Sequence, residues 1–437
     1  MSAKKELRGY SKAELINIIL EERQLRQELE ERLKEIEAML SQYNNANTPS
    51  SQQRFKENTK SKEEKQNSKD RFPGREKGHK GAGIKLPKPD KTTHHKINRK
   101  GYVKVGSWSK TVIDFAENPI IVTKHIIYQY KTPSGRIVEK KVDLPKGVYG
   151  KHLQAFNVLL KGKLGSSHES IADLIRALRP DITFCAATSQ KNTDFMAQTL
   201  QEERNNILHQ VREALYCNAD ETGLRQDGLN GYAWVFCTPT LCLYETDLSR
   251  SGKVPERVLG KDNDIILTVD GWQGYNKYNR QRCWPHLMRE LDKLAEDYKH
   301  VTNIQLQAAY LHKLYKQALQ AKKKPPNKRK KWVEKVDSKT ELGLMINSLS
   351  KTKHCKSFVT TLTNARPYLF TGVINPEIPL DNNHAERMLR KIVVHRKLMG
   401  CIRNEKGQLF IHNVMSCIQT WKLQQKNIYQ ELKKFAS

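Results

Sequence analysis

Apolar positions repeat with a helical period near the start of the chain. Ser11 and Glu14 have the spacing of a capping box, which opens many helices. Apolar residues then recur at steps of three, four or seven: Leu15, Ile18, Leu25, Leu29, Leu33, Ile36 and Leu40. This narrow stripe favours a coiled coil over residues 1–45, and so a homodimer. A solvated helix packed on its own chain has the same pattern and stays an alternative.

A change to β-forming residues predicts a small β-hairpin module over residues 111–150. Residues 120–130 and 136–142 are rich in β-formers, and they flank the turn sequence Thr132-Pro-Ser-Gly135. We therefore expect two antiparallel strands joined at this turn.

The pattern becomes helical over residues 151–213. Helices are expected near 150–163, 168–178 and 189–214. Residues 167–178 and 181–190 are a candidate helix-turn-helix that binds DNA. Any compact helical bundle shows the same periodicity, so this signal is weak.

Short apolar runs separated by turn residues predict a buried sheet from residue 214 onwards. The runs are residues 215–219, 232–238, 241–244 and 265–269. A helix-rich stretch over residues 286–349 follows. Within it, seven of the ten residues 322–331 are basic and two are proline, which predicts a solvated loop.

The excess of basic over acidic residues indicates what kind of partner the protein binds. The chain has 437 residues and a formal net charge of +30, which predicts a polyanionic partner. Its longest apolar runs, such as 232–237, are far shorter than the roughly 20 residues of a spanning helix, so we expect no membrane partner. The charged N-terminus has no apolar segment behind it, which predicts a cytoplasmic protein without a secretory signal.

Part of this charge lies in segments with few apolar residues. Residues 51–100 hold 16 Lys and Arg against 6 Asp and Glu, within a basic flexible linker predicted over residues 46–110. Such a segment can follow a phosphate backbone without folding first, or can act only as a solubilising linker. The candidate DNA-binding residues in the two basic segments are Lys77, His79, Lys80, Lys328, Arg329, Lys330 and Lys331.

Three acids are candidates for the chemistry. Asp220 and Asp270 each follow an apolar β run, and strand ends can hold carboxylates rigidly at the rim of a cleft. Either aspartate alone is weak evidence, because Asp is also common in turns. Glu386 is the third candidate, one turn into a helix that Asp381 or Asn382 would cap. The polar face of that helix carries Asn382, Asn383, Glu386 and Arg390, although an ordinary surface ion pair is the alternative.

Three converging carboxylates in a basic protein suit phosphodiester cleavage. Hard oxygen ligands hold Mg²⁺ or Mn²⁺, and two such ions roughly 3.5 to 4 Å apart clamp the attacking and leaving oxygens. Nearby cations offset the phosphate charge.

The motifs together resemble one known family. They are Asp220-Glu-Thr-Gly223, Asp270-Gly-Trp-Gln-Gly-Tyr275, Cys283-Trp-Pro-His286 with Arg289, and Asp381-Asn-Asn-His-Ala-Glu-Arg387 followed by Arg390 and Arg396-Lys397. In this order they resemble the insertion sequence 66 family of bacterial transposases, and the resemblance covers nearly the whole chain.

The resemblance implies an α/β fold with an RNase-H-like catalytic core and an Asp-Asp-Glu triad. Asp220 and Asp270 would end adjacent strands, and Glu386 would come from a later helix. The expected parts are a first core segment (214–289), a mostly helical insertion (290–370), a second core segment with the acidic helix (371–400) and a C-terminal helical tail (401–437). The residues expected to contact DNA beside the triad are Asn382, Asn383, Arg387, Arg390, Lys391, Arg396 and Lys397.

The implied activity is transposition in the bacterial cytoplasm, in association with the nucleoid. Such a protein binds the terminal inverted repeats of its element as a dimer, hydrolyses a strand there and joins the 3′-hydroxyl to target DNA. Accessory proteins of the element are further candidate partners. The rival functions are a domesticated, non-catalytic DNA-binding regulator and a nuclease without strand transfer.

We do not expect zinc. The eight cysteines include no pair at the two-residue gap of a zinc knuckle, and they are expected to be buried thiols. Cys283-x-x-His286 has the spacing of half a zinc site, but the adjacent His354 and Cys355 are awkward as the other half. Where many family members have a Cys-Pro-x-Cys-Gly ribbon, this chain has Lys131-Thr-Pro-Ser-Gly135, so the hairpin lacks metal ligands.

Overall fold

The computed structural model describes residues 88–94, 108–113, 115–116, 118–145, 147–337 and 341–436. The chain divides into two compact units, Met1–Val112 and Ile113–Ser437, and the helices and strands below belong to the second. The expected coiled coil over residues 1–45 lies outside the described residues, as does most of the basic segment 46–110. None of the helices in the described part of the chain is both long enough and apolar enough to cross a membrane.

A short hairpin confirms the predicted turn. β1 (Gln129–Lys131) pairs antiparallel with β2 (Ile137–Glu139). Gly135 has a φ of +84°, and its N–H donates to the carbonyl oxygen of Thr132 at 2.9 Å. All residues of both strands are exposed, so no buried face extends the pairing along the longer β-rich runs of the sequence.

The next helices are α3 (Lys151–Leu159) with the π-helical turn η2 (Leu160–Leu164), α4 (His168–Leu178), α5 (Ala186–Thr199) and α6 (Gln201–Arg212). The helix expected over 189–214 is thus two helices. The second helix of the candidate helix-turn-helix begins at Ala186 and not at Asp181. Pro180 explains the end of α4, because it keeps Arg179 in an extended conformation (φ −152°, ψ 91°). The seven-residue connection 179–185 is longer than the usual turn of three or four residues.

Among the described residues, five strands form one mixed sheet in the order β5-β4-β3-β6-β7. They are β3 (Tyr216–Gly223), β4 (Tyr232–Cys237), β5 (Cys242–Asp247), β6 (Ile266–Val269) and β7 (Arg280–Arg282). Strands β5, β4 and β3 are antiparallel, whereas β6 and β7 run parallel to β3. The four predicted strands are confirmed. Strand β7 was missed because its three side chains are polar, and α7 (Lys253–Leu259) leads from β5 to β6.

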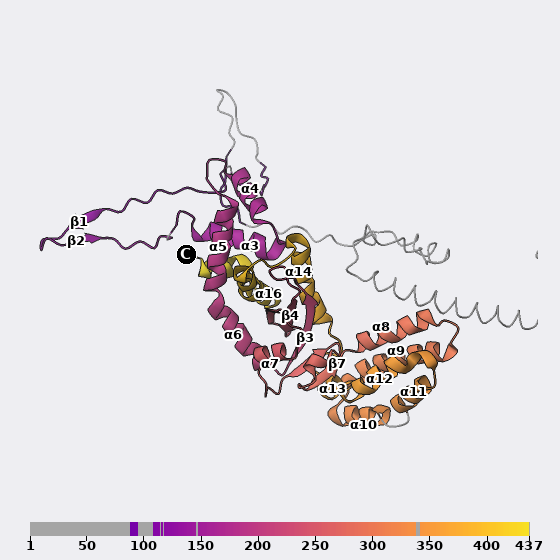
Figure 1. Cartoon of the computed structure of the whole chain (residues 1–437). Helices are drawn as coiled ribbons and strands as arrows, with labels where there is room; N and C mark the ends of the chain where they lie inside the picture. The colour runs from indigo at the N-terminus through magenta and orange to yellow at the C-terminus, as the bar shows by residue number, and fades with distance from the viewer. Residues whose placement is uncertain are drawn as a thin grey trace, which may run out of the picture. The chain divides into compact units, whose positions relative to one another are not determined.

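C-terminal helices cover this sheet. They are α14 (Asn383–Met399), α15 (Glu405–Leu409), η6 (Phe410–Met415), α16 (Ser416–Leu423) and α17 (Ile428–Phe435). Helix α14 packs on β3 and β4, and α16 packs on β5 (Figure 1). Trp421 and Leu432 share one hydrophobic core with the strands, so the expected tail over 401–437 is helical and is part of the sheet's core.

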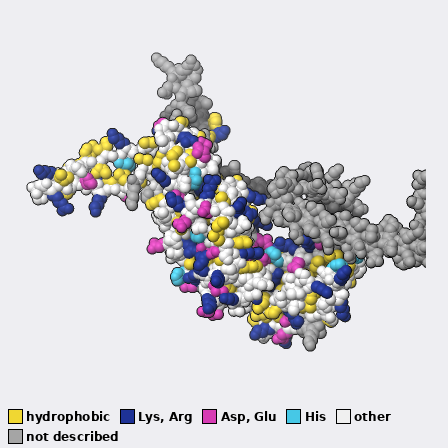
Figure 2. Space-filling view, viewed as in Figure 1, with side chains coloured by type: hydrophobic (Ala, Val, Ile, Leu, Met, Phe, Trp, Pro, Cys, Tyr) yellow, Lys and Arg dark blue, Asp and Glu magenta, His cyan; other side chains and the backbone are white. Residues whose placement is uncertain are grey.

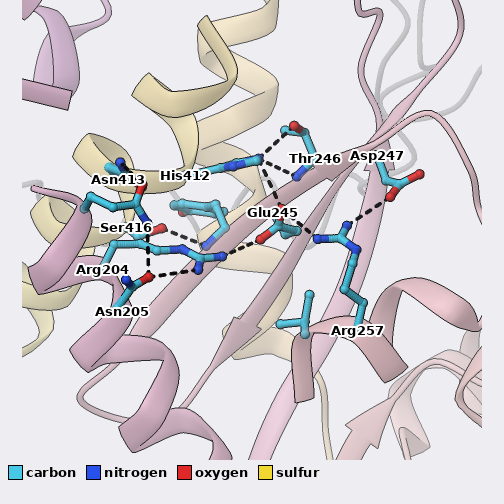
Figure 3. A network of polar contacts seen from close by, with 12 residues as sticks. Arg204, Asn205, Glu245, Thr246, Asp247, Arg257, His412, Asn413 and Ser416 are labelled. Carbon is cyan, nitrogen blue, oxygen red and sulfur yellow. Dashed lines mark hydrogen bonds and ion pairs between the residues drawn. The ribbon is translucent and has the colours of Figure 1, made fainter. Parts of the chain in front are cut away.

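The edge strand β5 is closed by side chains. Its backbone N–H groups donate to Thr420 Oγ1 at 3.0 Å, to Ser416 Oγ at 2.8 Å and to His412 Nε2 at 2.9 Å. An edge whose donors are occupied cannot pair with another chain. Beside it, the buried Glu245 carboxylate pairs with Arg204 and Arg257 (Figure 3).

A helical lobe with its own hydrophobic core lies between β7 and α14 in the sequence. Its helices, orange in Figure 1, are α8 (Trp284–Asp297), α9 (Thr302–Lys322), α10 (Pro326–Asp337), α11 (Leu342–Ser350), α12 (Lys356–Ala365) and α13 (Thr371–Ile374). The short 3₁₀ turns η4 (Lys353–Cys355) and η5 (Arg366–Tyr368) flank α12.

The prediction of a solvated loop over residues 322–331 was wrong. Residue 322 ends α9, and α10 begins at Pro326, so only residues 323–325 connect the two helices. Proline suits the first position of a helix, where its missing N–H has no intrahelical partner to lose. The apolar Trp332, Val333 and Val336 then pack into the core of the lobe, which stabilises α10 despite its basic start.

Candidate active site

The sequence predicted Asp220 at the end of a strand, but the residue lies inside β3. Strand β3 continues to Gly223, and Asp220 is opposite Val235 of β4. On its other side, β3 pairs with β6 only as far as Asn218, opposite Thr268. Asp270 follows the last residue of β6 directly, so the predicted adjacency of the two strands is confirmed.

The electrostatics of Asp220 report a cluster of acids. Burial is the largest cause that raises the pKa of Asp220, followed by the carboxylates of Asp270 and Glu221, and Glu386 adds to them; the pKa reaches about 8. The N–H of Glu221 donates to Asp220 Oδ1 at 2.9 Å and opposes this rise. The cluster therefore carries negative charge that only a cation or a proton can offset.

Helix α14 is attached to β3 beside Asp220. Asn382 Nδ2 donates to the carbonyl oxygen of Ala219 at 2.9 Å, and Asn218 Nδ2 donates to Asn382 Oδ1 at 2.9 Å. Asn382, one of the two predicted cap residues, occupies the N-cap position, but it is fully buried, its side chain makes no capping hydrogen bond, and its amide joins α14 to β3. The cap comes from Asp381, whose Oδ1 accepts the N–H of Asn383 at 3.1 Å. This attachment positions Glu386 one turn into the helix.

Glu386 is paired with a residue of the helical lobe. Arg289 Nη2 on α8 lies 2.9 Å from Glu386 Oε1, and His286 Nε2 lies 3.7 Å from the same oxygen. Burial and the neighbouring Arg289 lower the pKa of His286, so Arg289 is the cationic partner of Glu386 at neutral pH. Because the Arg289 side chain is 58% exposed, this ion pair can open at little cost.

Cys283 and His286 interact at the junction of α8 and α14. His286 Nδ1 lies 3.1 Å from Cys283 Sγ, and the N–H of Asn382 donates to the same sulfur at 3.2 Å. Across the described ranges, no three His, Cys, Asp or Glu side chains are arranged as a ready metal site, the acidic triad included. All eight cysteines have free thiols, and six of them are buried.

A second buried acid connects the two aspartate segments. The Glu221 side chain is 2% exposed and accepts from Arg250 Nε at 2.9 Å and Nη2 at 2.7 Å. Tyr275 donates its hydroxyl to the other Glu221 oxygen at 2.7 Å. Because Tyr275 follows Asp270 by five residues, this bond joins the Asp270 segment to β3. In the sequence, the position of Glu221 directly after Asp220 was the available signal that Glu221 belongs to the site. That position did not reveal its partners, Arg250 and Tyr275.

The other predicted residues are distributed over several parts of the chain. Lys77, His79 and Lys80 lie outside the described residues. On α14, exposed side chains belong to Arg387, Arg390, Lys391 and Lys397, whereas Arg396 Nη1 donates to the carbonyl oxygen of Gly223 at the end of β3. On α10, Lys328, Lys330 and Lys331 are exposed, and Arg329 Nη1 donates to Lys324 O at 2.9 Å. Lys and Arg side chains are spread over the visible face (Figure 2).

Sequence comparison supplies the family. The family model described as Transposase IS66 family matches residues 146–409, more than half of the chain, and the match includes Asp220, Asp270 and Glu386. The chain belongs to this family. No curated protein and no solved structure matches it. Membership makes the protein a DNA-binding transposase, and the family implies the use of divalent metal in general.

Proposed function

We propose that this transposase cuts DNA at the ends of its element with Asp220, Asp270 and Glu386, and joins the 3′-hydroxyl to target DNA. Burial raises the pKa of Asp220, the charges of Asp270, Glu221 and Glu386 add to the rise, and this grouping of acids around a buried aspartate carries the proposal. The strand order of the sheet supports an RNase-H-like core, and the helical lobe between β7 and α14 supports an insertion into it.

The donor atoms suit a divalent cation. Asp220 and Asp270 would hold it through carboxylate oxygens, the ligands that Mg²⁺ and Mn²⁺ prefer. The N–H of Trp272 donates to Asp270 Oδ1 at 3.0 Å and orients that carboxylate. Glu386 would join once its pair with Arg289 opens, which fits the absence of a ready three-ligand site among the described residues. Two bound divalent ions would supply Lewis-acid stabilisation of the phosphodiester oxygens.

The remaining residues bind and orient the DNA. Arg387, Arg390, Lys391 and Lys397 lie exposed on the helix that carries Glu386, so they would contact phosphates next to the cleaved bond. Asn382 is buried and acts by positioning α14. We further propose that the protein binds terminal inverted repeats as a homodimer through residues 1–45, with the nucleoid as its cellular location.

Replacement of Asp270 by Asn tests this function. Asp270→Asn should lower the rate of metal-dependent nicking of an end-containing oligonucleotide by about 10³-fold or more, which is about 4 kcal/mol of barrier, while binding is retained. Asp247→Asn is the matched control, because Asp247 ends β5 and pairs with Arg257 at 2.9 Å. Nicking that survives in Asp270→Asn overturns the proposal.

Two further readouts separate the rival functions. Wild-type protein that binds ends but never nicks them in Mg²⁺ or Mn²⁺ would be a regulator. Protein that nicks ends but never joins them to a second duplex would be a nuclease.

A further inference from the structure

A polar cavity of about 730 Å³ lies between the segment after Asp270 and helix α12 of the helical lobe. Gly271, Arg280 and Arg282 line it from the side of the sheet, and Asn364 and Tyr368 line it from the lobe. Four hydroxyl-bearing side chains of Ser and Thr from α12 complete the lobe wall. The lining contains two guanidinium groups and no carboxylate, which is the composition of a site for an anion.

Both arginines have unused donors. Arg280 Nε and Arg282 Nη1 are buried and have no hydrogen-bond partner in the described part of the chain. Arg280 is nevertheless oriented, because its guanidinium lies 4.1 Å from the centroid of the Tyr368 ring and contacts Asn276 Oδ1. A buried donor without an acceptor costs free energy, and both guanidinium groups line the cavity, so an anion held there would lie beside arginines that no acceptor among the described residues fully satisfies.

Arg282 also connects the cavity to Asp270. No ion pair joins Arg282 to an acid among the described residues, although the charge of Asp270 acts on its guanidinium. Gly271 has a φ of +111°, and a Cβ atom there would lie 2.1 Å from Arg282 Cζ. Only glycine therefore lets the guanidinium lie against the main chain next to Asp270.

We propose that this cavity, named here the Arg280–Arg282 pocket, binds a backbone phosphate of the DNA strand that is cut at Asp270. The proposal rests on the function proposed above. A strand whose reacting phosphate lies at Asp270 brings its neighbouring phosphates to Gly271, the next residue along the chain and part of the lining. Arginine matches phosphate oxygens with two parallel N–H donors, and the Ser, Thr and Asn side chains can bond the remaining oxygens.

The test measures DNA binding in the Asp270→Asn background, so that it does not depend on cleavage. Each phosphate contact adds about 0.9 to the slope of log K against log salt concentration. Arg282→Gln should therefore lower the slope by about 1 and weaken binding of end DNA about tenfold at physiological salt. Arg403→Gln is the matched control, because Arg403 is exposed and is not part of the lining.

Asn364→Asp is the second variant. Asn364 is exposed on α12, so the change should leave the fold intact while it adds a negative charge that repels phosphate. Circular dichroism checks that each variant is folded. If Arg282→Gln is misfolded, the DNA affinity and salt slope of Asn364→Asp decide whether the pocket binds phosphate. Slopes and affinities of both variants equal to those of Arg403→Gln would overturn the proposal.

A mononucleotide distinguishes DNA from a free ligand. Thymidine 5′-monophosphate, titrated by calorimetry, should bind no tighter than millimolar to the full chain. Micromolar binding that Arg282→Gln abolishes would assign the pocket to a nucleotide and would overturn the DNA proposal. These outcomes are independent of cleavage by the wild-type protein, so failure of the pocket and failure of the proposed function are distinguishable.

Discussion

The carboxylates of Glu245 and Asp220 lie in the same sheet, and their surroundings are opposite. Glu245 on β5 pairs with Arg204 at 2.5 Å and with Arg257 at 3.3 Å (Figure 3). Asp220 on β3 is buried beside other acids, chiefly Asp270, and burial together with their charge raises its pKa to about 8. A buried acid that arginines compensate stabilises the fold, whereas a buried acid beside other acids is costly until a cation binds.

The backbone around the two acids differs in the same way. At β5, the edge donors are satisfied by Thr420, Ser416 and His412. His412 Nε2 accepts an N–H there and burial lowers its pKa, so this histidine is neutral and leaves the arginines to compensate Glu245. At β3, pairing with β6 stops at Asn218, so Asp220 is paired on the side of β4 alone. The charge of Glu245 is thus compensated by arginines of the chain, whereas that of Asp220 has acidic neighbours, which fits the proposed metal site.

The largest effect should come from the pH dependence of Asp220 in metal-free buffer. Its folded pKa of about 8 lies above the unfolded value of about 3.9, so the folded state binds more protons between these values. The free energy of unfolding should therefore fall as pH rises from about 4 to about 8, by up to about 5 kcal/mol, and added Mg²⁺ should reduce the fall.

Urea unfolding at several pH values measures this effect. Asp220→Asn should remove most of the fall, and Asp247→Asn should retain it. A fall that Asp220→Asn leaves unchanged would contradict the contrast between the two carboxylates.

Glu245→Gln should give the next largest effect. It leaves the Arg204 guanidinium, whose side chain is only 13% exposed, without its charged partner and should lower the free energy of unfolding by about 3 kcal/mol. Glu169→Gln is the control, because Glu169 is exposed on α4 and pairs with Arg176 in solvent, so its change should leave stability unaltered. Equal urea midpoints for Glu245→Gln and wild type would mean that the pairs of Glu245 with arginine do not stabilise the fold.

Tyr275→Phe should have the smallest effect and should separate positioning from stability. It removes the hydroxyl that donates to Glu221 and should cost about 1.5 kcal/mol of unfolding free energy, because Arg250 still binds the other oxygen. It should also slow single-turnover cleavage, since the Asp270 segment loses its bond to β3.

Tyr278→Phe is the matched control for this change. Its hydroxyl donates to the carbonyl oxygen of Gly260 at 2.7 Å, so it should lose similar stability but cleave at the wild-type rate. Equal cleavage rates for Tyr275→Phe and Tyr278→Phe would limit the role of Tyr275 to stability.

Much of the fold was predictable because its signals are local. The apolar runs predicted strands β3 to β6, and the alternation of polar and apolar residues after Asp381 predicted the helix that carries Glu386. Residues 322–331 show the limit of this reasoning. Their charge indicates a loop, but Trp332 and Val336, outside that window, bury the helix against the lobe.

The sequence by itself determined the acids, their order along the chain and the basic surroundings, because motifs and composition are properties of the chain alone. Only the tertiary structure decided what each charged group contacts. Glu221 contacts Tyr275, 54 residues away in the sequence, and Arg250, 29 residues away. Arg289 pairs with Glu386, which lies 97 residues further along the chain. Contacts at such separations depend on how strands and helices pack, and packing also decides whether a buried charge is compensated within the chain or by a ligand.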